Sequence, residues 1–112
     1  MQDLLSLHCQ YYSQNDPRLS PHEITEYLKT LTGWTVNENL ISKTYKFKNY
    51  YQTIAFVNAV AYIVHEQDHH PEIKLTYNSC VVEFTTHSIN ALSLNDFICA
   101  AKINNLDKVT EK

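Results

Sequence analysis

The sequence lacks the features that several common classes of protein require. It contains a single glycine and no block rich in lysine or arginine, and its formal net charge is −3. Proteins that bind nucleic acid electrostatically need a basic face that displaces counterions. No segment approaches the roughly 18 apolar residues of a membrane-spanning helix. We therefore expect neither direct nucleic-acid binding nor insertion into a membrane.

Cysteine is also scarce. Cys9, Cys80 and Cys99 make an odd number at wide spacings, which is neither a disulfide framework nor a metal-binding knuckle. This usage fits a reducing compartment best. The N-terminus has no basic segment, and the apolar run over residues 4–7 is interrupted, so no signal peptide is indicated. We expect a soluble, cytoplasmic protein.

The sequence does contain enough apolar residues for one domain. A chain of 112 residues, of which 44% are hydrophobic, can bury a core but has no room for a second domain. Residues 1–19 are expected to form an N-terminal arm or short helix. Residues 20–105 are expected to form the domain, and residues 106–112 a polar C-terminal tail.

Signals for helix termini mark the first helix. Ser20 can serve as its N-cap, Pro21 occupies the first helical position, and Glu23 can complete a capping box. Gly33, the only glycine, is placed to end the helix. These residues predict a helix over about residues 21–32.

The rest of the chain alternates between the periods of strands and helices. Apolar residues at every second position predict a strand over residues 41–47, paired with the segment after Trp34, and a second hairpin over residues 73–86. Between them, Ile54, Val57, Ala61 and Val64 form a helical stripe, which predicts a mostly buried central helix from residue 50 to about residue 65.

A last helix follows an N-cap at Ser93. The expected order is therefore α-β-β-α-β-β-α. Two antiparallel hairpins separated by a long helix indicate an α+β domain, in which the helices pack on one face of a four-stranded antiparallel sheet.

The most informative segment is Asp-His-His-Pro-Glu at residues 68–72, followed by a third histidine, His87. An imidazole can give or take a proton near neutral pH. The turn of the second hairpin brings the residues after Pro71 close to those before His87. His69, His70 and His87 can then share one cleft, which predicts a proton-transfer site.

Simpler interpretations compete with this one. Residues 65–69 match HExxH, which in zinc proteases places two histidines on one helical face. Pro71 disfavours a helix that continues past His69, and no third ligand is obvious, so zinc proteolysis is disfavoured. His69 and His70 alone could be loop residues. Ser93-x-x-Asp96 is a good helix cap, which favours a structural role for Asp96.

These residues resemble a known family, the pterin-4a-carbinolamine dehydratases, also called the dimerization cofactor family. The resemblance covers roughly residues 19–104 and rests on Leu28, Gly33-Trp34, Tyr45-Lys46-Phe47, the segment 68–72, Tyr77, Thr86-His87, Leu92-Ser93 and Asp96. It implies a dehydratase that converts 4a-hydroxytetrahydrobiopterin to quinonoid dihydrobiopterin and water, with no metal and no organic cofactor. Such an enzyme acts in tetrahydrobiopterin recycling, after an aromatic amino-acid hydroxylase.

The resemblance also implies the roles of particular residues. His69 and His87 would be the acid–base pair, and His70 would position the pterin and assist. The implied site consists of the catalytic residues His69, His70 and His87 and the substrate-binding residues Pro71, Thr86, Ser88 and Asp96.

A second interpretation is a protein-interaction module without catalysis, because members of the family can also act as a transcriptional coactivator or dimerization cofactor. The joint presence of His69, His70 and His87 favours the enzyme. The resemblance further implies a homodimer or a homotetramer, in which edge strands of the sheet are protected by pairing.

Overall fold

A computed structural model describes residues 3–106. The elements, in chain order, are η1 (Leu4–Ser6), α1 (Pro21–Leu28), β1 (Thr35–Asn37), β2 (Leu40–Lys46), α2 (Tyr50–Gln67), β3 (Glu72–Leu75), β4 (Ser79–Phe84), η2 (His87–Ile89) and α3 (Leu94–Asn104). The predicted order of strands and α-helices is confirmed. Of the expected C-terminal tail, residues 107–112 lie outside the described residues.

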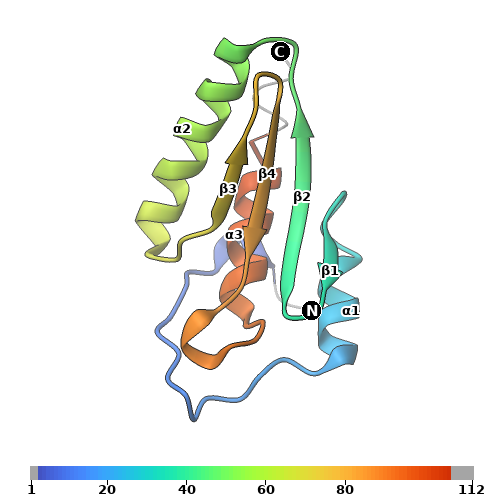
Figure 1. The fold of residues 1–112 in the computed structure, drawn as a ribbon. Coiled ribbons are helices and arrows are strands. Elements are labelled where there is room, and N and C mark those ends of the chain that lie inside the picture. The colour runs from blue at the N-terminus through green and yellow to red at the C-terminus, as the bar shows by residue number, and fades with distance from the viewer. Residues whose placement is uncertain (1–2, 107–112) are drawn as a thin grey trace.

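The four strands form one antiparallel sheet in the order β1-β2-β4-β3. Helices α2 and α3 lie over the same face of this sheet (Figure 1), so the predicted α+β architecture is confirmed. Alternate residues of β4 are buried, Cys80, Val82 and Phe84, because successive side chains of a strand point to opposite faces. No helix within residues 3–106 is long and apolar enough to cross a membrane.

Helix α1 begins as predicted but ends earlier. Ser20 Oγ accepts a hydrogen bond from the Glu23 N–H, and Glu23 Oε1 accepts one from the Ser20 N–H, so the capping box is present. The helix ends at Leu28 rather than near residue 32. Hydrogen bonds of the tighter i→i+3 kind follow, and Gly33 then takes a φ of 87°, which suits glycine. The glycine therefore ends the turn after the helix, not the helix itself.

The central helix is α3 and not α2, which corrects the prediction from the apolar stripe. On α2 only one side is buried, through Thr53, Phe56, Val60 and Val64, whereas Ala61 is exposed. Every residue of α3 from Asn95 to Ala101 is buried.

The N-terminal arm explains the burial of α3. Residues 3–19 begin with the short helix η1, whose Leu4 joins the hydrophobic core. Lys102 Nζ on α3 donates a hydrogen bond to the Leu5 carbonyl, and the Asn95 amide bonds the backbone of Gln10. Helix α3 is therefore enclosed between the sheet and the arm.

One side chain joins the end of α3 to the first hairpin. Asn104 Oδ1 accepts hydrogen bonds from Trp34 Nε1 at 3.0 Å, Lys43 Nζ at 2.9 Å and Tyr45 Oη at 2.7 Å. Its Nδ2 donates to the Thr32 carbonyl at 3.1 Å. Because the Trp34 and Tyr45 side chains are buried, this shared acceptor fixes how the helix meets the sheet.

We expect Asn104→Leu to lower the free energy of unfolding by about 2 kcal/mol, because the buried side chains of Trp34 and Tyr45 each lose this acceptor. Asn104→Asp keeps the acceptor oxygen, loses only the donor to the Thr32 carbonyl, and should cost less. Urea unfolding of the two variants, compared with the wild type, measures the difference. Equal stability of all three proteins would contradict this role for Asn104.

Candidate active site

The end of α2 places the first two histidines. Asp68 takes a left-handed conformation with a φ of 52°, and the His69 N–H donates back to the Val64 carbonyl. This cap ends the helix at Gln67, and Pro71 then keeps His70 out of helical geometry. His65 and His69 therefore do not share the face of a continuous helix, as the zinc-protease motif would require.

A buried carboxylate orients His69. Its Nε2 lies 2.6 Å from Asp96 Oδ1, and the Asp96 side chain is 0% exposed. The imidazole also stacks on the Phe84 ring, with centroids 5.7 Å apart and planes 8° from parallel. Because a carboxylate only accepts hydrogen bonds, Nε2 carries the proton of this bond. The ring nitrogen left to exchange a proton is then Nδ1.

The second oxygen of Asp96 anchors the neighbouring segments. Oδ2 accepts hydrogen bonds from Thr86 Oγ1 at 2.8 Å and from the Ser93 N–H at 2.9 Å. The Ser93 and Thr86 hydroxyls lie 2.7 Å apart, and Ser93 and Asp96 form the capping box of α3. Asp96 thus has the capping role that its sequence position indicates, and it also holds a site histidine.

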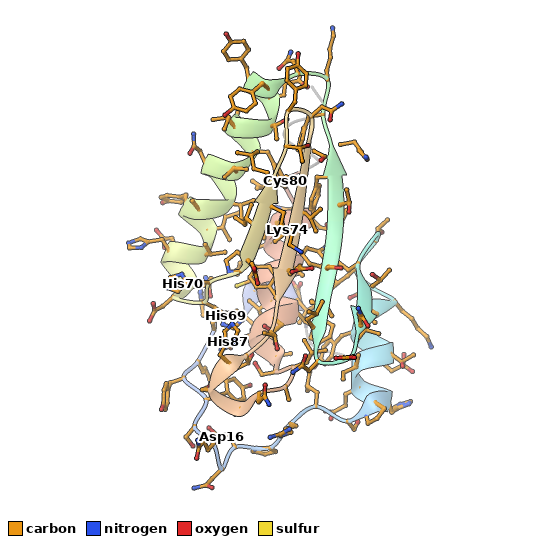
Figure 2. All side chains as sticks on the ribbon, viewed as in Figure 1. Asp16, His69, His70, Lys74, Cys80 and His87 are labelled. Atoms are coloured by element: carbon orange, nitrogen blue, oxygen red, sulfur yellow. The ribbon has the colours of Figure 1, made fainter. Side chains whose placement is uncertain are left out.

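A tight loop after β4 places the third histidine. Thr86 and Ala91 pair through two backbone hydrogen bonds, and Asn90 takes a left-handed conformation with a φ of 52°. His87 starts the short helix η2 inside this loop. The side chains of His69, His70 and His87 come together at one end of the β3–β4 hairpin (Figure 2).

His70 and His87 line a shallow pocket of about 40 Å³. The other lining residues come from the strands and their ends, Leu40, Glu72, Glu83, Phe84 and Thr85. Pockets that enclose a ligand typically reach roughly 300 Å³ or more. This pocket is therefore too small to enclose a ligand of that size.

The remaining predicted residues differ in how they face this pocket. Pro71 is half-buried beside His70, and Ser88 is exposed. Thr86 is buried, and its hydroxyl is engaged with Ser93 and Asp96. Its neighbour Thr85 lines the pocket instead.

Sequence reasoning missed the carboxylates of the pocket. Glu72 and Glu83 are register partners across β3 and β4, and both line the pocket. Lys74 Nζ lies 3.8 Å from Glu83 Oε2. The hairpin register would have revealed the pair, because partners across a hairpin share one face of the sheet.

The site and fold together define an α+β protein with a histidine–carboxylate pair beside two further histidines. Residues 17–106 match the family described as pterin 4 alpha carbinolamine dehydratase. The chain belongs to this family, as its sequence motifs indicated.

Individual relatives agree with this assignment. A protein of Bdellovibrio bacteriovorus, provisionally named pterin-4-alpha-carbinolamine dehydratase, is 58% identical over 95 residues, which cover 81% of this chain and 79% of that protein. A Nitrosospira multiformis protein with the same provisional name is 52% identical over 107 residues, covering 96% and 95% of the two chains.

Solved structures share the fold. The crystal structure of a transcriptional coactivator/pterin dehydratase from Brucella melitensis matches with a TM-score of 0.77 and 33% identity, over 80% of this chain and 98% of that one. A pterin dehydratase-like protein identified as a RuBisCO assembly factor in the alpha-carboxysome matches with a TM-score of 0.55 and 22% identity, over 65% and 84% of the chains. The second likeness concerns the fold alone.

We expect Asp96→Asn to change the tautomer of His69. The oxygen of the new amide should still accept the hydrogen bonds from the Ser93 N–H and the Thr86 hydroxyl. In that orientation the amide NH₂ group points toward His69 Nε2. That nitrogen must then accept, so the ring proton moves to Nδ1. Nitrogen-15 NMR of the histidine rings measures this shift, with exposed His22 as internal control. An Nε2-protonated His69 in the folded variant would contradict the assigned geometry.

Proposed function

We propose that the protein dehydrates a 4a-hydroxytetrahydropterin to the quinonoid dihydropterin, using the three histidines as acid, base and positioning groups. The observation that carries the proposal is the convergence of His69, His70 and His87 at one end of the β3–β4 hairpin. His70 and His87 line the open pocket there, and His69 is held nearby by the buried Asp96. Membership of the family supports the same activity.

The reaction needs two proton transfers. The 4a-hydroxyl leaves as water when an acid protonates the departing oxygen, while a base removes the proton from ring nitrogen N5. His69 and His87 are proposed as this acid–base pair. His69 is suited to it because its bond to Asp96 leaves Nδ1 to exchange the proton and fixes the plane of the ring.

The pocket residues suit a pterin. The 2-amino group and the ring N–H of a pterin are hydrogen-bond donors, and the carboxylates of Glu72 and Glu83 at the pocket are acceptors. The shallow pocket would hold one edge of the pterin ring, and His70 would position that ring. The side chain of the pterin would extend into solvent. Pro71 and the backbone of residues 86–88 are proposed as the rest of this binding surface.

We expect His70→Ala and His87→Ala each to lower the rate of dehydration by roughly 10²–10⁴-fold, the usual contribution of a positioned acid or base. Both residues are exposed, so the fold should be retained. His22→Ala on α1, whose side chain is 82% exposed, should keep the wild-type rate. The measurement is the formation of quinonoid dihydropterin from enzymatically generated 4a-hydroxytetrahydropterin.

The same assay separates the enzyme from an interaction module. The Brucella melitensis protein is described as a transcriptional coactivator/pterin dehydratase, and a fold alone does not fix an activity. No acceleration by the folded wild type would reject the dehydratase and favour the interaction module. Acceleration lost in both histidine variants supports the proposal.

We further propose that the chain self-associates as a homodimer or homotetramer and acts on the product of an aromatic amino-acid hydroxylase. In the described sheet β1 and β3 each have one neighbouring strand, and such edges are commonly protected by pairing with another chain. Light scattering of the purified protein measures the oligomer, and a monomeric mass would contradict it.

A further inference from the structure

Two cysteines far apart in the sequence meet beside the site. Cys9 Sγ in the N-terminal arm lies 3.6 Å from Cys99 Sγ on α3. Cys9 is half-buried, whereas Cys99 is 0% exposed. Cys80 lies toward the opposite end of the β3–β4 hairpin from the three histidines (Figure 2). The expectation from spacing alone, that the cysteines form no framework, does not exclude this pair.

Hydrogen bonds on both sides hold the arm where the sulfurs meet. The Cys9 N–H donates to Gln67 Oε1 at 2.8 Å. The Gln10 N–H donates to Asn95 Oδ1 at 2.9 Å, and Asn95 Nδ2 donates to the Gln10 carbonyl at 2.6 Å. A disulfide bond is about 2.05 Å long, so the two sulfurs need to approach by only roughly 1.5 Å.

The environments of the two thiols differ in a way that suits stepwise oxidation. The hydrogen bond from Cys99 lowers the pKa of Cys9, His69 and Lys102 favour its thiolate electrostatically, and burial and Asp96 oppose them. The pKa of Cys99 is raised because it donates that hydrogen bond and is buried. The thiolate is the nucleophilic form of cysteine, so Cys9 is the thiol that reacts first with an oxidant and Cys99 is the partner.

We propose that Cys9 and Cys99 form a peroxide-responsive dithiol site, which closes into a disulfide that fastens the N-terminal arm to α3. The Cys9 thiolate attacks one oxygen of hydrogen peroxide, the O–O bond breaks, and a sulfenic acid and hydroxide result. The Cys99 sulfur then displaces the hydroxyl from the Cys9 sulfur, and its proton leaves with that hydroxyl as water. The hydroxide from the first step takes up the proton that Cys9 lost on forming its thiolate, so in total two thiols are oxidised and one peroxide is reduced to two waters.

The disulfide would tie the arm to both segments of the histidine site. Gln67, which bonds the Cys9 backbone, is two residues before His69, and Asn95 precedes Asp96. Oxidation would therefore fix the arm against the two segments that carry the His69–Asp96 pair.

The test treats the reduced full-length protein with hydrogen peroxide and examines it without reducing agent. Trypsin cuts after Arg18 and Lys102, and a glutamate-specific protease cuts after Glu83, which separates Cys80 from Cys99. We expect an intact mass lower by two hydrogens and a peptide pair joined through Cys9 and Cys99. Cys80→Ala should keep this crosslink, and Cys9→Ser should lose it.

A thiol count in the oxidised wild type avoids any dependence on the folding of variants. After oxidation, a maleimide added in denaturant should label Cys80 alone, and treatment with a reducing agent should restore labelling of Cys9 and Cys99. A crosslink from Cys9 to Cys80, a crosslink between two chains, or oxidation of Cys9 to sulfinic acid with Cys99 still labelled would each overturn the proposal, as would no reaction.

Discussion

The rest of the site depends on the hydrogen bonds of one buried carboxylate. Burying a charge costs several kcal/mol unless other groups compensate it, and Asp96 accepts from His69, Thr86 and Ser93. These donors come from the end of α2, the end of β4 and the start of α3. Among residues 3–106 no buried polar side-chain atom lacks a partner. The need to satisfy Asp96 therefore fixes how three segments meet.

This constraint explains why the histidines differ. His69 is held between Asp96 and the Phe84 ring, so its side chain is only 11% exposed and has one orientation. His70, one residue later, is 74% exposed. A buried, oriented imidazole and an exposed one suit different tasks, because proton transfer needs fixed geometry whereas contact with a ligand edge tolerates adjustment.

Local patterns in the sequence predicted most of the fold and the proximity of the three histidines. The capping boxes at Ser20 and Ser93 and the two hairpins depend on neighbouring residues, and the second hairpin is what brings His87 back to His70. The relative burial of α2 and α3 could not be predicted in this way, because it depends on the arm. The apolar stripe of α2 resembles that of a central helix, but the arm covers α3 instead. The orientation of Thr86 could not be predicted from the sequence either, because its hydroxyl points toward Asp96 rather than the pocket.

The arm shows how a segment with no strong local pattern can still belong to the core. Part of its backbone forms hydrogen bonds with side chains of distant elements, Gln67 on α2 and Asn95 and Lys102 on α3. Such contacts produce no periodic sequence pattern in residues 1–19. The packing of the arm on α3 and the proximity of Cys9 to Cys99 therefore could not be predicted from sequence spacing. Because Asn95 joins the arm while the adjacent Asp96 joins His69, docking of the arm and orientation of the histidine depend on the same first turn of α3.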